Sequence, residues 1–243
     1  MVAVVVGGDH DLIISCVEAN IFPRYVRNDS GHQIGHIDYV VRRSLKFAST
    51  VSDINYDIVY VVAAYHDLGH YVDAFRHEQV SAKMVRTDAF LRKFFTLAEI
   101  ETIAEAIEDH RSHIDRPRRS VYGKIVASAD CNINVDVMLR RTYSYRVKNF
   151  PAMPLEEVIE ESRQHLCRKY GEEGYARGKM YFPDPEFDRA LRELIDLVDD
   201  PVAQSILGAF GFVEGCAVLD RVFPSYAYGS HTTTVRIVVG FGV

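Results

Sequence analysis

One apolar segment in the N-terminal half of the chain constrains the fold most strongly. Residues 56–67 leave almost no polar face, because their apolar members are Ile58, Val59, Val61, Val62, Ala63 and Ala64. A helix that is apolar on every side has to be surrounded by other helices. The segment nevertheless ends in His66-Asp67, and burying an ionised carboxylate is unfavourable unless a partner charge, hydrogen bonds or a metal ion compensate it. We therefore expect a central helix that carries a polar site at its end.

Helical periodicity recurs along most of the chain. Apolar residues spaced three and four apart predict helices over residues 34–50, 56–67, 77–85, 97–110, 122–134, 137–147, 155–170 and 187–198. The sequence therefore predicts an all-α fold. We expect a single domain over residues 1–207, in which a five-helix core at 20–140 holds the site and accessory helices at 141–207 pack around it.

The last part of the chain has a different character. From residue 208 onward charged residues are few, glycines are frequent, and residues 232–239 are rich in β-branched side chains. This composition is typical of a hairpin, an edge strand or a poorly ordered extension, and the sequence does not choose among them. We treat residues 208–243 as a separate C-terminal tail.

Composition excludes several classes of function. The chain is 48% hydrophobic and 26% charged, as is usual for a globular protein with a sizeable core, and its net charge of -6 gives no support to an extended nucleic-acid-binding surface. The four cysteines have no zinc-finger spacing, so we expect neither a disulfide framework nor a thiolate metal site, and a reducing cytoplasm is the expected location. The apolar run at residues 2–6 is too short to span a membrane, and we expect no membrane partner.

Six side chains offer the nitrogen and oxygen atoms of a metal site. Each lies near a predicted helix end or on an apolar face, and in chain order they are His36, His66, Asp67, His77, His110 and Asp130. Any one of them alone is more often an ordinary hydrogen-bonded residue, but the six together favour a site. Imidazole and carboxylate ligands without thiolates suit one or two divalent transition-metal ions, which could be manganese, iron, nickel, cobalt or zinc.

This ordered set resembles that of the HD-domain superfamily of metal-dependent phosphohydrolases, which is named for the adjacent His-Asp pair, here His66-Asp67. The resemblance covers about residues 20–140 and implies an HD-domain helical bundle. It further implies a four-ligand core site at His36, His66, Asp67 and Asp130. In branches with two ions, Asp67 bridges them and His77 and His110 complete the second position. The segments at 141–145 and 181–182 are similar to a group of bacterial HD proteins.

The chain departs from two branches of that superfamily. The branch that cleaves cyclic dinucleotides carries a lysine where this chain has His70, and its Gly-Tyr-Pro motif does not occur here, which argues against that substrate. The segment His66-Asp67-Leu68-Gly69-His70, with its second histidine, resembles the corresponding motif of the nucleotide triphosphohydrolase branch. The chain is short for the large fold of that branch.

Charge favours a phosphorylated substrate. Four neutral imidazoles and two carboxylates around two divalent ions leave a net charge of about +2, which suits a phosphate monoester or phosphoanhydride. The leading hypothesis is a metal-dependent phosphohydrolase that uses a metal-activated water or hydroxide on a nucleotide or another small phosphorylated metabolite. The alternative is a metal-dependent nucleotide-binding or sensor module without catalysis. A purely structural polar cluster without metal is the third possibility.

Roles for individual residues follow from that hypothesis. Asp67 would bridge the ions and orient the reacting groups, and Arg111, next to ligand His110, could clamp a phosphoryl oxygen. His70 and His113 could protonate the leaving oxygen or contact the phosphate. The alternative for each of these three is an ordinary surface side chain.

Overall fold

The computed structural model describes residues 8–111, 114, 116–131, 134–171, 173–176 and 180–199. Within these residues the chain is helical and contains no β-strand, so the predicted all-α fold is confirmed. The α-helices are α1 (Gly8–Asn20), α2 (Ile34–Ala48), α3 (Tyr56–Tyr65), α4 (His77–Thr87), α5 (Leu97–Glu108), α6 (Val121–Ala129), α7 (Val135–Asn149), α8 (Leu155–Tyr170) and α9 (Pro185–Asp199). Short 3₁₀ helices lie at η1 (Phe22–Arg27), η2 (Ser30–His32) and η3 (Leu91–Lys93). The tail at 208–243 lies outside the described residues.

Helix α3 lies at the centre of the N-terminal helices, as its composition predicted. All eight residues from Ile58 to Tyr65 are buried, and α3 packs against α1, α2, α4, α5 and α6. The helix begins where the Asn55 side chain accepts hydrogen bonds from the backbone N–H groups of Asp57 and Ile58, at 2.9 and 3.3 Å. Such a cap satisfies donors that have no partner inside the helix. The other end of α3 therefore delivers His66 and Asp67 into the interior.

Capping side chains also set the limits of α5 and α6. Thr96 and Glu99 form a capping box at the start of α5, where each side chain accepts from the backbone N–H of the other. Ser120 caps α6 through the N–H of Gly123. The turns that follow α5 and α6 carry His110 and Asp130, which lie beside Asp67 and His66 at the end of α3.

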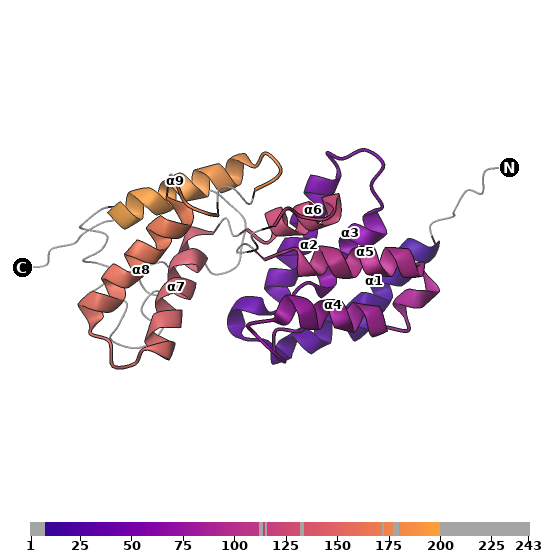
Figure 1. The fold of residues 1–243 in the computed structure, drawn as a ribbon, viewed down its shortest axis with the longest axis horizontal. Coiled ribbons are helices and arrows are strands. Elements are labelled where there is room, and N and C mark those ends of the chain that lie inside the picture. Colours follow the sequence, from indigo (N-terminus) through magenta and orange to yellow (C-terminus); the bar gives the residue numbers. More distant parts are fainter. Residues whose placement is uncertain are drawn as a thin grey trace, which may run out of the picture.

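The helices form two groups, α1–α6 and α7–α9, which lie side by side (Figure 1). Each has an apolar cluster of its own, and the second cluster begins at Val135. The groups are joined by a buried ion pair from Arg43 Nη2 to Asp184 Oδ2 at 2.6 Å, and by stacking of Phe47 on Phe182 with ring centroids 5.3 Å apart. The assignment of residues 1–207 to one domain stays a prediction.

None of the helices in the described part of the chain has the length and apolar character needed to cross a membrane.

Candidate metal centre

The six predicted ligand residues converge at one place in the N-terminal helix group. His36 lies in the first turn of α2, His66 and Asp67 follow α3, and His77 is the first residue of α4. His110 lies two residues beyond α5, and Asp130 directly follows α6. Their ligand atoms form two triads, each within 4.8 Å: His36, His66 and Asp67 in the first, and Asp67, His77 and His110 in the second. Asp67 belongs to both.

The Asp67 carboxylate divides its two oxygens between the triads. Its Oδ1 lies 3.1 Å from His77 Nε2 and 3.5 Å from His110 Nε2. Its Oδ2 lies 3.3 Å from His66 Nε2 and 3.4 Å from His36 Nε2. Asp130 joins the first triad, because its Oδ1 is 3.1 Å from His36 Nε2 and 3.9 Å from His66 Nε2. Each oxygen of Asp67 thus faces two imidazoles.

Backbone contacts determine which nitrogen of three rings carries the proton. The Nδ1 atoms of His66, His77 and His110 lie 2.8, 2.9 and 2.7 Å from the carbonyl oxygens of Ala63, Ala74 and Ile107, respectively. A carbonyl oxygen only accepts, so each Nδ1 donates its N–H and each Nε2 of a neutral ring is left with a lone pair. Histidines that bind metals are held in this way by their other ring nitrogen.

This arrangement fits a divalent cation. Lone pairs of imidazole nitrogens facing carboxylate oxygens repel one another unless a positive charge lies between them. His36 Nε2 and His66 Nε2 are buried and have no hydrogen-bond partner among the described residues. With metal–nitrogen bonds of about 2.1 Å, neighbouring ligand atoms on one ion are expected about 3.0–3.4 Å apart, close to the separations around Asp67. The residues present are therefore suited to hold an ion in each triad.

The electrostatics of the centre also favour positive charge. Burial alone would raise the pKa of Asp67, but the imidazoles of His66, His110 and His36 beside its carboxylate hold it well below the usual range. Burial alone would lower the pKa of His36, but the Asp130 and Asp67 carboxylates beside its ring raise it to about 9. The His36 ring likewise holds the pKa of Asp130 below its usual range, although burial alone would raise it, so both carboxylates remain ionised at neutral pH and attract a cation to the space between the rings.

A model of the HD domain matches residues 34–132, the span that contains all six of these side chains. Residues 34–132 therefore belong to the HD-domain superfamily. This is a superfamily of metal-dependent phosphohydrolases, so the resemblance noted in the sequence is confirmed, and the His and Asp groups of this HD domain could hold a divalent metal. Neither the curated proteins nor the solved structures contain a significant match to the chain.

A buried asparagine that the sequence analysis did not identify supports the centre of the HD domain. Asn28 donates from Nδ2 to the carbonyl oxygen of Asp67 at 3.0 Å, and its Oδ1 accepts from the N–H of Tyr71, also at 3.0 Å. Tyr25 donates its hydroxyl to the Ala64 carbonyl at 2.8 Å. These contacts hold the turn after α3 to the segment before α2. The sequence carries no signal for Asn28 beyond its residue type, because its role depends on a partner 39 positions away.

A glycine brings the same turn against α4. A Cβ at Gly69 would lie 2.7 Å from Val80 Cβ and 2.8 Å from the backbone nitrogen of Ser81, so only glycine permits this approach. The N–H of Gly69 donates to Ser81 Oγ at 2.8 Å. Gly69 therefore fixes the distance between Asp67 and His77, the first residue of α4.

The three residues predicted to act on the substrate have different surroundings. Arg111 is partly buried, and its Nη1 donates to Glu78 Oε2 at 3.0 Å and to the carbonyl oxygen of Phe75. His70 belongs to neither triad of the HD domain, and its ring lies 5.1 Å from the ring of His77. His113 lies outside the described residues.

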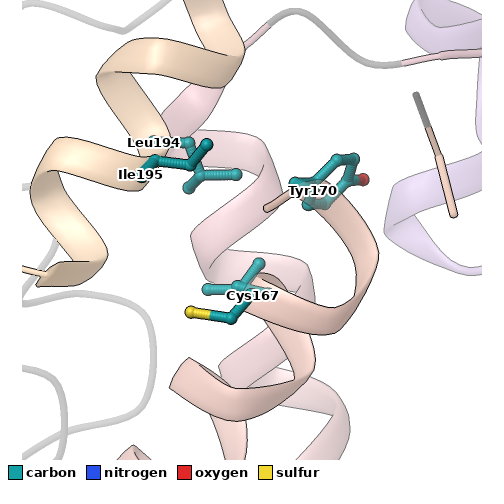
Figure 2. Close-up of a pocket in the computed structure, with 5 residues that line it drawn as sticks. Cys167, Tyr170, Leu194 and Ile195 are labelled. Carbon is teal, nitrogen blue, oxygen red and sulfur yellow. The ribbon is translucent and has the colours of Figure 1, made fainter. Parts of the chain in front are cut away.

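A small cavity lies in the second helix group, away from the HD domain centre. Its lining comes from α8 and α9 and consists of Leu166, Cys167, Tyr170, Leu194 and Ile195 (Figure 2). None of these five side chains is a carboxylate or an imidazole. This cavity therefore lacks the ligand set of the metal centre.

Proposed function

We propose that this HD domain hydrolyses a phosphoester or phosphoanhydride bond in a nucleotide or another small phosphorylated metabolite, with two divalent transition-metal ions as cofactors. The observation that carries the proposal is the position of Asp67, whose two oxygens face the imidazoles of separate triads. A carboxylate shared in this way suits a pair of ions on either side of one phosphoryl group.

Each ion would have its own histidines, and the two ions would share Asp67. His36, His66, Asp67 and Asp130 would hold the first, and Asp67, His77 and His110 the second. The ligand set suits manganese, iron, nickel, cobalt or zinc. Bound ions of this kind lower the pKa of water and neutralise charge on phosphoryl oxygens.

The protein itself would hold the metal-binding rings in a fixed orientation and keep bulk water out of the centre. The bonds from Nδ1 of His66, His77 and His110 to backbone carbonyls prevent the three rings from turning. Asp67 is 2% exposed and His66 is fully buried, so bulk water does not reach the inner face of the centre. Rigid donors in a dry site need little reorganisation when the substrate reacts.

Arg111 and His70 would contact the substrate. The Nη1 atom of Arg111 is held by Glu78, and its other guanidinium donors have no partner among the described residues, so they can bind a phosphoryl oxygen. Burial lowers the pKa of His70 more than the charges of Asp67 and Asp29 raise it. A neutral imidazole at pH 7 favours a hydrogen-bonding role for His70 over proton donation. His113 stays a candidate for phosphate contact.

Purified protein loaded in turn with manganese, iron, nickel, cobalt or zinc should hydrolyse members of a panel of phosphomonoesters, phosphodiesters and nucleotides. Asp67→Ala should abolish that turnover. Asp38→Ala is the matched control, because Asp38 is an exposed residue of α2 whose partner is Arg42, one turn away.

Two outcomes would refute the proposal. One is no turnover of any substrate with any of these metals, and the other is turnover that Asp67→Ala leaves unchanged. Tight nucleotide binding measured by calorimetry without product over hours would instead support the metal-dependent binding module.

A further inference from the structure

A second polar cluster lies beside the metal centre and includes a residue from the second helix group. It consists of Asp29, His32 and His70 together with Arg141 of α7. His32 stacks on His70 with ring centroids 3.9 Å apart. The cluster thus brings together the segment before α2, the turn after α3 and the first helix of the second group.

His32 connects a carboxylate to the arginine. Its Nδ1 lies 2.7 Å from Asp29 Oδ1, and its Nε2 lies 2.6 Å from Arg141 Nη2. A guanidinium only donates, so Nε2 accepts from Arg141 and the ring proton on Nδ1 is donated to Asp29. Both nitrogens of His32 are therefore engaged, which argues against this ring as a metal ligand.

No carboxylate among the described residues forms an ion pair with Arg141. The only side-chain hydrogen-bond partner of Arg141 among the described residues is the His32 ring. The His32 imidazole lies between the Arg141 guanidinium and the Asp29 carboxylate. Arg111, by contrast, is paired with Glu78. A partly buried guanidinium with a neutral partner keeps its positive charge and its planar donor fork for an anion.

The second polar cluster lies directly beside the metal centre. The His32 ring lies 5.9 Å from the His36 ring and 6.5 Å from the His77 ring, and the His70 ring lies 5.1 Å from His77. A ligand could therefore place one oxyanion at the two triads and extend toward the second cluster. A second negatively charged group on that ligand would then reach the Arg141 guanidinium.

We infer that Arg141 binds a second oxyanion of the substrate, a phosphate or a carboxylate, while His32 and Asp29 position its guanidinium. The inference rests on the proposed function for the first oxyanion, which the metal centre would take. It narrows the substrate class to compounds with two anionic groups close together, such as diphosphates or phosphorylated carboxylic acids.

Calorimetry on the metal-loaded full chain tests this without turnover. Three probes that are not hydrolysed are compared: orthophosphate with one oxyanion, methylenediphosphonate with two phosphonates, and phosphonoacetate with a phosphonate and a carboxylate. Arg141→Ala should weaken binding of at least one two-anion probe about 10- to 100-fold, as expected for loss of charge-assisted hydrogen bonds, and leave orthophosphate within about twofold. The two-anion probe that is affected identifies the second group as phosphate or carboxylate.

Control variants distinguish the loss of a direct contact between Arg141 and the ligand from a general structural effect of the substitution. Lys148→Ala removes an exposed cation from the same helix and should change none of the three affinities. Arg141→Lys should restore part of the lost affinity because it keeps the charge but not the planar fork. His32→Ala should weaken the same probe as Arg141→Ala, and His32→Gln should restore part of it because its amide oxygen can accept from Arg141. Metal content is measured for every variant and should equal that of the wild type.

The inference is overturned if wild type binds neither two-anion probe more tightly than orthophosphate, or if Arg141→Ala changes all three affinities equally or not at all. A chain that hydrolyses no phosphoester but shows the Arg141-dependent preference would refute the proposed function and leave this binding site standing.

Discussion

The Nε2 atoms of His77 and His110 face each other at 3.2 Å, and each ring donates its Nδ1–H to the backbone carbonyl three residues earlier. A hydrogen bond between these two Nε2 atoms would require one ring to be a charged imidazolium. A cation bound by both lone pairs and by Asp67 Oδ1 satisfies all three groups at once.

The first prediction concerns metal stoichiometry. His77→Ala and His110→Ala should each lower the metal content by one ion per chain, because they damage one triad, whereas Asp67→Ala should remove both ions. Elemental analysis after metal loading and desalting measures the ratio. Equal metal content in wild type and His77→Ala would contradict the assignment of a second ion.

His70 should affect turnover and not metal binding. It lies outside both triads, so His70→Ala should keep the metal content of the wild type and lower kcat/KM for phosphorylated substrates about tenfold or more, by loss of a substrate hydrogen bond. Steady-state kinetics beside elemental analysis checks both parts. Loss of metal in this variant would place His70 among the ligands instead.

The ion pair between the helix groups should matter for stability. Arg43 is 6% exposed and Asp184 is 4% exposed, so Arg43→Met leaves a buried carboxylate without its partner and should cost about 3–5 kcal/mol of unfolding free energy. Urea denaturation measures this change. The double variant Arg43→Met, Asp184→Leu should recover most of the loss, and a double variant as unstable as the single one would show that packing, not charge, is responsible.

Gly69→Ala should destabilise the protein by about 1–3 kcal/mol, because overpacking forces the turn after α3 away from α4. A Cβ there would lie 2.7 Å from Val80 Cβ. Gly35→Ala is the control, since Gly35 is exposed in α2 and alanine favours a helix. Thermal unfolding compares the two. An unchanged melting temperature for Gly69→Ala would mean that the contact with α4 relaxes at no cost.

His165 in α8 makes the second helix group sensitive to acid. Burial, together with the charges of Lys169, Arg146 and Arg168, lowers the pKa of His165 to about 4. The unfolded chain, with a histidine pKa of about 6.5, therefore takes up this proton first, and stability falls as the pH drops from about 6.5 to 4. Because the ring is only half-buried, we expect a loss on the order of 1 kcal/mol.

Urea denaturation at pH 7 and pH 5 measures the His165 effect. His165→Gln does not titrate in this range, so its unfolding free energy should fall less between the two pH values than that of the wild type. Identical pH dependence of the two proteins would contradict a lowered pKa at His165.

Helix positions were predictable because they depend on short-range patterns. The expected helices at residues 34–50, 56–67 and 97–110 begin at the same residues as α2, α3 and α5, and each extends two residues past the observed end. Those differences lie at the C-terminal ends, next to the C-caps Ser49, His66 and Asp109, which periodicity alone does not locate. The apolar character of α3 was sufficient to predict its central place.

The surroundings of Arg111, His32 and Arg141 were not predictable in the same way. Arg111 pairs with Glu78 across 33 positions, and Arg141 meets His32 across 109. The sequence shows that these residues carry charge or a ring but not which of them end up in contact.

By itself, the sequence determined an all-α fold, a buried His66-Asp67 pair and six side chains with the donor atoms of a metal centre, because residue types and helical periodicity are local properties. Only the tertiary structure decided that each oxygen of Asp67 faces two imidazoles, that three of those rings present lone pairs, and that Arg141 reaches the centre from the second helix group. These relationships are distances between segments far apart in the chain, and packing of the helices sets them.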